Sequence, residues 1–357
     1  MNYKTLIIDG HLDLAMNAID WNRDLRKSVD EIRLLEAGKT DLRGRADGTI
    51  SFEEMRKGKV GLCLSTLIAR YAKPDHPLGG WQSPEQAWSQ TCAQLAWYRE
   101  MEREGQMTQI KSKKDLEDHL VKWRTGTTAS IGYILTLEGA DSIISWEHLE
   151  QRVSEGLVAI GPAHYGPGTY AYGTDSEGSI GKKGRDLLTQ MEKRNLVLDA
   201  THLCDTSFWE ALDHFSGHIW ASHSNCRAIV DHNRQFGDDQ LKALVDRDAM
   251  IGLPLDAWMM IPGWVKFESH PSNTDIRLEH MVAHIDHICE LAGDTRHVGL
   301  GTDLDGGFGR EQTPSDVRTI ADMQRLPEVL SDRGYSDDDI EAIMWGNWLR
   351  KITEVLN

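Results

Sequence analysis

Short apolar runs alternate with longer amphipathic segments along these 357 residues, and this alternation constrains the fold more than any other feature. Eight runs are rich in apolar and β-branched residues. They lie at 5–9, 60–68, 130–138, 156–164, 196–202, 218–224, 250–256 and 297–306. The segments between them have helical character at 83–102, 184–195, 238–248 and 277–293, and the first of these starts with Ser83 as N-cap and Pro84 at the first helical position. Strands that alternate with helices predict a parallel sheet with right-handed crossovers.

The number of these units favours a closed barrel. Runs that are apolar throughout, rather than at every second position, are typical of a sheet covered on both faces. Eight such units predict an α/β fold, a (β/α)8 TIM barrel, and a barrel commonly uses this length as one domain, here 1–357. Periodicity alone leaves a doubly wound open sheet as the alternative.

Composition excludes some classes of protein. The formal charge of −17 argues against a nucleic-acid-binding protein, which normally carries a basic face. No run of about 18 apolar residues is present, so we expect no membrane span. The first ten residues, MNYKTLIIDG, do not resemble a secretory signal, and the five cysteines are dispersed without a CxxC pair. We therefore expect a cytoplasmic protein with reduced thiols.

Polar residues of metal-binding type end six of the eight apolar runs. They are His11 and Asp13, Glu138, His164, His202, His223 and Asp303. In a barrel these strand ends surround one mouth, where catalytic residues lie. Imidazole and carboxylate ligands without cysteine suit Zn²⁺, Mn²⁺, Fe²⁺ or Co²⁺. One tetrahedral ion needs fewer ligands than these, so a two-metal site with a bridging carboxylate, which generates a hydroxide nucleophile near neutral pH, uses them better.

Other motifs carry less weight. His280, His284 and His287 share one helical face, but no HExxH glutamate accompanies them, so packing and capping is the favoured interpretation. The stretch 43–54 resembles an EF-hand loop, yet Arg43 and Arg45 stand where the first two carboxylates belong, which excludes Ca²⁺. No GxGxxG or GxxxxGK[ST] nucleotide loop is present. The stretch 258–276 is predicted to be a long irregular loop.

Five motifs, in this order, carry a resemblance to a known family. They are DGHLD at 9–13, LEGAD at 137–141, DATH at 199–202, SHSNCRAIVDHNR at 222–234 and VGLGTDLDGG at 298–307. The chain resembles the membrane (renal) dipeptidases and their bacterial relatives, peptidase family M19, within the amidohydrolase-like metal-dependent barrels. The resemblance runs from about Thr5 to Leu356.

This resemblance implies a distorted (β/α)8 barrel with a binuclear zinc site, two zinc ions per chain, although other divalent metals are possible. His11 and Asp13 would hold one ion, His202 and His223 the other, and Glu138 would bridge both. The implied catalytic residues are Asp303, His164 and Glu138, with His164 polarising the scissile carbonyl. Asp303 would take a proton from the attacking water and pass it to the leaving amine. Arg234, which the sequence alone places in an exposed loop, would bind the terminal carboxylate of the substrate, and the implied substrate-binding residues are thus His164 and Arg234.

The expected function is hydrolysis of a dipeptide, with an L,D-dipeptide possible, through a hydroxide that bridges the metals. An N-acyl amino acid or a lactone is an alternative substrate, and a catalytically silent barrel that acts as a binding protein is a further alternative. The segment GLPLDAWMMIPGW from Gly252 replaces the polar-aromatic pair usual in the family, and YGPGTYAYG follows His164. Both departures concern the substrate pocket. The partners expected are a small-molecule substrate and, from the resemblance, a second copy in a homodimer.

Overall fold

All nine strands in the described part of the chain are parallel. The computed structural model describes residues 6–73, 76, 78–126, 129–266 and 268–356. The strands are β1 (Ile7–Leu12), β2 (Val60–Ile68), β3 (Met107–Gln109), β4 (Ile131–Glu138), β5 (Leu157–Gly161), β6 (Val197–Asp199), β7 (Ile219–Ala221), β8 (Met250–Leu253) and β9 (Val298–Leu300). Each of the eight predicted runs overlaps one of these strands, and seven contain it entirely; β1 extends three residues beyond the run at 5–9.

Eight of the strands close into a barrel. β1 pairs with both β2 and β9, and β2 pairs with β4, while the remaining neighbours follow in order from β4 to β9. The predicted (β/α)8 barrel is confirmed, and the open-sheet alternative is wrong. β3 was not predicted, because two of its three residues are polar and no apolar run marks it in the sequence; it pairs with the first residues of β4 outside the closed ring.

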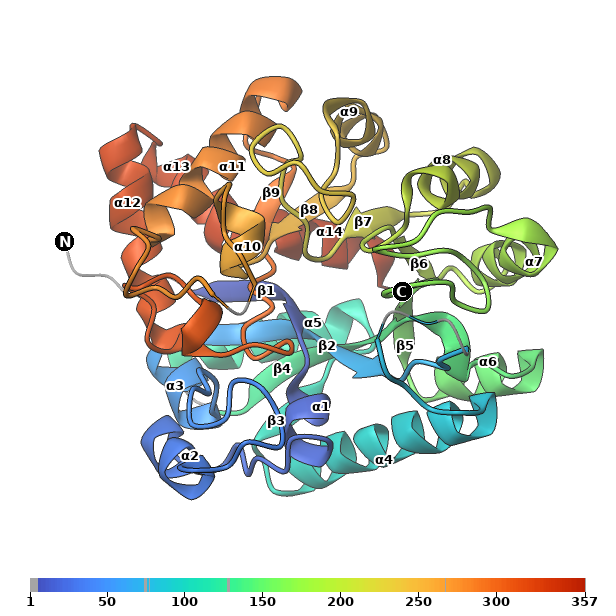
Figure 1. Ribbon diagram of the computed structural model, residues 1–357, viewed down its shortest axis with the longest axis horizontal. Helices are drawn as coiled ribbons and strands as arrows, with labels where there is room; N and C mark the ends of the chain where they lie inside the picture. The colour runs from blue at the N-terminus through green and yellow to red at the C-terminus, as the bar shows by residue number, and fades with distance from the viewer. Residues whose placement is uncertain (1–5, 74–75, 77, 127–128, 267, 357) are drawn as a thin grey trace.

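Helices surround the strands (Figure 1). They are α1 (Leu14–Ile19), α2 (Val29–Glu36), α3 (Phe52–Lys57), α4 (Pro84–Arg103), α5 (Lys113–Thr125), α6 (Trp146–Ser154), α7 (Gly181–Glu192), α8 (Asp205–His214), α9 (Asp238–Asp246), α10 (Ala257–Met260), α11 (Leu278–Ala292), α12 (Leu326–Arg333), α13 (Asp337–Glu341) and α14 (Asn347–Val355). The predicted start of α4 is confirmed, because Ser83 accepts a hydrogen bond from the Gln86 N–H and Pro84 is the first helical residue. Within the described residues, no helix has the length and hydropathy needed to span a membrane.

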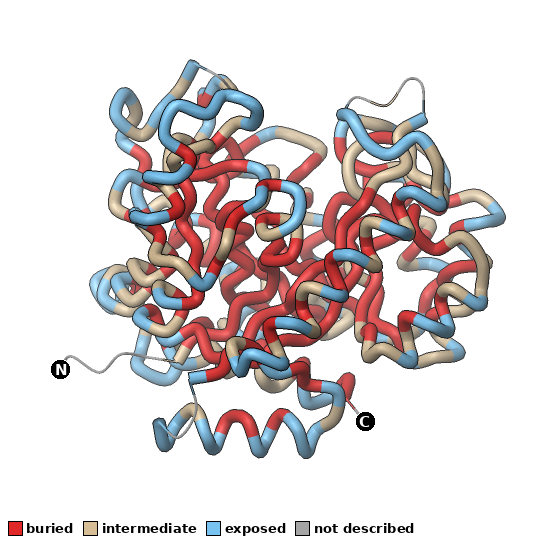
Figure 2. Tube along the Cα trace, turned by 90° about the horizontal axis from the view of Figure 1, so that it is seen from below, coloured by how far each residue is buried: buried red, intermediate tan, exposed pale blue. Residues whose placement is uncertain are grey.

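Large side chains fill the barrel interior and leave polar groups to the strand ends. Trp348 of α14 packs edge-to-face on Trp220 of β7, and its indole donates a hydrogen bond to the Leu300 carbonyl. Gly10 and Gly299 make room for this ring, because a Cβ at either position would lie 2.3–2.7 Å from Trp348 atoms. Figure 2 shows the buried segments inside an exposed outer layer.

The stretch 258–276 is only partly the irregular loop expected. It opens with the short helix α10, and Trp258, Met259 and Met260 are buried. His284 of α11 anchors this segment: its Nε2 donates to the Met260 carbonyl, and its Nδ1 accepts the Cys226 N–H. The packing interpretation of the α11 histidines is therefore confirmed at His284.

Candidate metal centre

The carboxyl ends of the barrel strands bring the predicted polar residues to one mouth. His11 lies in β1, and Glu138 is the last residue of β4. The loops that follow β1, β5, β6, β7 and β9 carry Asp13, His164, His202, His223 and Asp303. All of these except His11 line one cavity of about 50 Å³, with room for a few water-sized groups. The convergence predicted from the sequence is present.

Glu138 lies at the centre of the cluster. Its Oε1 is 3.1 Å from His202 Nε2 and 3.4 Å from His223 Nε2. Its Oε2 is 3.6 Å from His11 Nε2. One carboxylate thus faces two groups of histidines with its two oxygens, which is what a bridging ligand requires.

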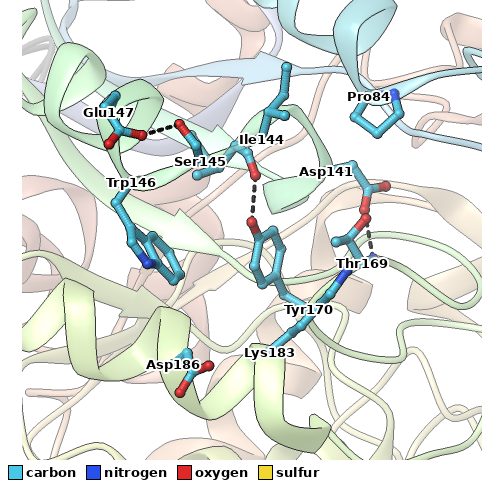
Figure 3. Close-up of a pocket in the computed structure, with 11 residues that line it drawn as sticks. Pro84, Asp141, Ile144, Ser145, Trp146, Glu147, Thr169, Tyr170, Lys183 and Asp186 are labelled. Atoms are coloured by element: carbon cyan, nitrogen blue, oxygen red, sulfur yellow. Dashed lines mark hydrogen bonds between the residues drawn. The ribbon is translucent and has the colours of Figure 1, made fainter.

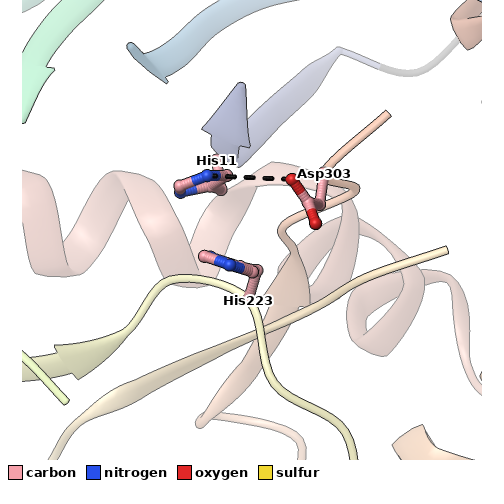
Figure 4. Close-up of side chains that lie close together, drawn as sticks. All are labelled: His11, His223 and Asp303. Carbon is pink, nitrogen blue, oxygen red and sulfur yellow. Dashed lines mark ion pairs between the residues drawn. The ribbon is translucent and has the colours of Figure 1, made fainter. Parts of the chain in front are cut away.

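His11 connects the remaining carboxylates to this centre. Its Nε2 is 3.7 Å from Asp13 Oδ2 and 3.8 Å from Asp303 Oδ1. Figure 4 shows His11, His223 and Asp303 gathered around one space. Three overlapping sets have ligand atoms within 4.8 Å of one another: His11, His223 and Asp303; Glu138, His164 and His202; and His11, Asp13 and Glu138.

These side chains fit a divalent metal site. Two ligands that each lie about 2.1 Å from a tetrahedral zinc ion are about 3.4 Å apart, and the observed separations of 3.1 to 3.8 Å bracket that value. His11 Nε2, Asp13 Oδ1 and Glu138 Oε1 are buried and have no hydrogen-bond partner among the described residues. Leaving such atoms unpaired costs free energy, and a bound cation would satisfy all three.

Hydroxyl groups turn the histidine rings toward the cluster. Thr174 Oγ1 lies 2.9 Å from His202 Nδ1, and Ser222 Oγ lies 2.9 Å from His223 Nδ1. Occupying Nδ1 leaves Nε2 free to bind a metal, a common outer-shell arrangement. His202 also has a left-handed backbone, with φ of 68°, and Asp303 likewise has φ of 54°. Strain of this kind in non-glycine residues is concentrated at functional sites.

Two aspartates that the sequence analysis did not select tie the strand ends together. Asp9 accepts hydrogen bonds from the backbone and hydroxyl of Thr302, next to Asp303. Asp199 accepts the backbone N–H groups of Thr201 and Ser222, next to His202 and His223. Asp9 belongs to the motif DGHLD and Asp199 to the motif DATH, and each fixes the backbone beside candidate metal-binding side chains.

Burial keeps three imidazoles neutral. It lowers the pKa of His164, His202 and His223 well below the ordinary value, and neighbouring positive charge acts in the same direction. Neutral imidazole is the form that binds metals.

His11 behaves differently in the metal-free protein. Burial alone would lower its pKa, but the charges of Glu138, Asp13 and Asp303 outweigh burial and raise it to about 10. A metal ion bound by His11 would have to displace this proton, so its affinity would fall as the pH falls.

Two arginines complete the mouth. Arg234 is 3% exposed, so its placement in an exposed loop was wrong; its guanidinium donates to Ser224 Oγ and to the His223 carbonyl. Arg70, which follows β2, was not selected from the sequence because nothing local distinguishes it. Its Nη1 lies 2.7 Å from His164 Nδ1. Arginine can only donate, so His164 Nδ1 is the acceptor and its Nε2 carries the proton.

A larger hollow of about 370 Å³ lies apart from the cluster (Figure 3). It is lined by Pro84, Trp146 and Tyr170, among others, and includes none of the metal-binding candidates. Asp141 of the LEGAD motif borders it, and its carboxylate accepts the Thr169 and Tyr71 N–H groups. This aspartate therefore holds two loops together.

Comparison with known proteins identifies the family. The sequence model described as membrane dipeptidase, peptidase family M19, matches residues 1–357. The chain belongs to the membrane dipeptidase family. It is thereby placed among the metal-dependent dipeptidases, as the five motifs predicted.

Individual relatives are distant. An uncharacterised dipeptidase of Schizosaccharomyces pombe is 27% identical over 98% of this chain and 81% of its own length. An uncharacterised protein encoded in the pqqA 5′ region of Klebsiella pneumoniae is 28% identical over 53% of this chain, and the match spans 65% of the length of that relative. A metallopeptidase of Rhodobacter sphaeroides, solved with a phosphinate mimic of the dipeptide L-Ala-D-Ala, has a TM-score of 0.78 at 19% identity. That match covers 98% of this chain and 99% of the other, and it supports the fold.

Proposed function

We propose that this protein hydrolyses the amide bond of dipeptides, with L,D-dipeptides among the candidate substrates, using two zinc ions. The observation that carries the proposal is the position of Glu138, whose Oε2 lies near His11 Nε2 and whose Oε1 lies near the Nε2 atoms of His202 and His223. The dipeptide mimic bound by the Rhodobacter sphaeroides metallopeptidase supports this substrate class.

The donor set divides into two halves around Glu138. His11 and Asp13 would hold one ion, and His202 and His223 the other, since each pair reaches the same carboxylate. When bound, the ions would polarise the scissile carbonyl and lower the pKa of an attacking water.

His164 is placed to stabilise the oxygen of the scissile carbonyl. Because Arg70 occupies its Nδ1, its Nε2–H points to the cluster, 3.9 Å from Glu138 Oε1. Hydrogen-bond donors aimed at a developing oxyanion are among the largest contributions to catalysis.

Asp303 is the proton carrier in this scheme. Burial raises its pKa well above the ordinary value; the His11 charge opposes that shift, while Asp13 and Glu138 add to it. A carboxyl group with a raised pKa can accept a proton from the attacking water and return it to the leaving amine as the C–N bond breaks. Arg234 would bind the terminal carboxylate, since its guanidinium pairs only with neutral oxygens among the described residues.

Metal analysis and a substrate panel test the proposal together. We expect close to two zinc ions per chain and cleavage of dipeptides from an L,L and L,D panel. The Arg234→Met variant should raise KM for dipeptides by about 10-fold or more, the value of a hydrogen bond to a charged group. Two bound ions with cleavage of only N-acyl amino acids or lactones would keep the metal site but replace dipeptides as the substrate class. A protein that binds no metal after reconstitution would contradict the proposal.

Loss of Arg70 should lower kcat more than it raises KM. In the Arg70→Met variant His164 can adopt either neutral tautomer, and about half of the molecules would present an acceptor instead of a donor to the carbonyl oxygen. Loss of orientation adds to this, so we expect kcat to fall about 10-fold or more with KM little changed. Steady-state kinetics would show it, and Arg70→Lys should restore part of kcat. An unchanged kcat in Arg70→Met would exclude this role.

A further inference from the structure

A buried carboxylate that takes no part in the metal cluster lines the same cavity. Asp256 follows β8 and is 8% exposed, and the cavity that it borders also contains Arg234, Asp303 and Glu138. Asp256 has no role in the proposed hydrolysis.

Neutral donors alone satisfy Asp256. Its Oδ2 accepts the indole N–H of Trp258 at 2.6 Å, and its Oδ1 accepts the side-chain amide of Gln312 at 2.6 Å. No cationic side chain forms an ion pair with it in the part of the chain that the structure describes. Gln312 leaves its own Oε1 buried without a partner among the same residues. The surroundings of Asp256 thus contain more hydrogen-bond acceptors than donors.

Lys266 lies near Asp256 without forming an ion pair with it among the described residues. Lys266 Nζ sits 3.8 Å from the ring centroid of Trp258, while the edge of the same indole donates to Asp256. Trp258 therefore binds the ammonium on its face and the carboxylate at its edge. Burial raises the pKa of Asp256 to about 6; the hydrogen bonds and the charges of Lys266 and Arg234 oppose that shift, so the carboxylate is ionised at neutral pH.

An ionised, buried carboxylate without a cationic partner is costly unless something pairs with it. Arg234 is the corresponding cation without an anionic partner, since it is buried and donates only to neutral oxygens among the described residues. The two charges lie on loops that follow neighbouring strands, β7 and β8, and line one cavity. Together they match a ligand that carries an anion and a cation close together.

We propose that Asp256 binds a positively charged side chain on the carboxyl-terminal residue of the substrate, so that dipeptides ending in a basic amino acid are preferred. The inference rests on the proposed dipeptide hydrolysis and on Arg234 as the site of the terminal carboxylate. The terminal carboxylate and the side chain next to it belong to the same residue of the substrate. With the carboxylate on Arg234, it is therefore the carboxyl-terminal side chain, and not the amino-terminal one, that reaches Asp256.

The test compares kcat/KM for Ala-Lys, Ala-ornithine and Ala-Arg with that for Ala-norleucine, each with an L- or D-residue at the carboxyl end. In the zinc-loaded wild-type protein we expect at least one basic dipeptide to exceed Ala-norleucine by about 10-fold or more. In Asp256→Asn, which keeps the size of the side chain, that ratio should fall to about 1. Metal content confirms that the variant is folded and loaded.

Asp175→Asn is the matched control. Burial lowers the pKa of Lys266, and the charges of Asp256 and Asp175 both oppose that shift. Asp175 is exposed, however, and its partner is His232, at 3.4 Å. The Asp175→Asn variant should keep the preference for the basic residue to within about 2-fold, since screened surface charges contribute little.

The possible failures are distinguishable. Cleavage of neutral dipeptides without a preference for basic ones, or a preference that survives in Asp256→Asn, would overturn the inference and leave the proposed function in place. A preference for Lys-Ala over Ala-Lys, or an equal loss on all dipeptides in Asp256→Asn, would overturn it too, since Asp256 would then serve another group. Failure to cleave any dipeptide would overturn the proposed function itself.

Discussion

The Glu138→Gln variant should lose most of its metal and nearly all of its activity. Glu138 is the only carboxylate among the described residues with one oxygen near His11 and the other near His202 and His223. A neutral amide cannot bridge two cations in the same way. Even outer-shell partners of metal ligands are worth about 10–100-fold in affinity or activity, so a shared direct ligand should cost at least about 100-fold in kcat/KM.

Metal analysis by mass spectrometry, with activity measured on the same samples, checks this expectation. The bound zinc should fall from close to two ions per chain to about one or fewer. Glu147→Gln provides the control, since Glu147 is an exposed glutamate at the start of α6 and should change neither value. A Glu138→Gln protein that retains two ions and normal kcat/KM would refute the bridging role.

The Asp303→Asn variant should separate proton transfer from metal binding. The amide would keep the shape of the side chain but could not carry a proton between water and the leaving amine. Loss of a general acid–base group typically costs about 10²–10⁴-fold in rate, and we expect kcat to fall within that range while the zinc content stays close to that of the wild type.

This second variant also tests an alternative role for the same residue. Asp303 Oδ1 is 3.8 Å from His11 Nε2, so its carboxylate could itself be a metal ligand. Loss of zinc in parallel with kcat would favour that role over proton transfer. Asp338→Asn, at an exposed position in α13, should leave both quantities unchanged.

Local patterns explain why so much of the barrel could be predicted. β2 and β4 are long, fully buried parallel strands, and each can be read as an apolar run in the sequence without knowledge of its neighbours. The same holds for the cap that starts α4, where Ser83 and Pro84 act on adjacent backbone groups. β3 was not predicted because two of its three residues are polar, so that no apolar run marks it, and its pairing with β4 depends on a distant segment.

The candidate metal ligands were predictable for a related reason. Each is the polar residue that ends an apolar run, and closure of any eight-stranded barrel brings those ends to one mouth. His11, Glu138 and His223 therefore needed only their own strands and the rule of closure.

What the sequence by itself determined is thus the succession of strands and the chemical type of the residues at their ends. Only the tertiary structure decided that Arg70 contacts His164, that Arg234 is buried, and that Asp256 faces the cavity without a cationic partner among the described residues. The physical reason is that these three side chains lie on irregular loops, whose direction is set by packing against distant segments such as α11 and Trp258, whereas a strand end has its direction fixed by the backbone pairing of its immediate neighbours.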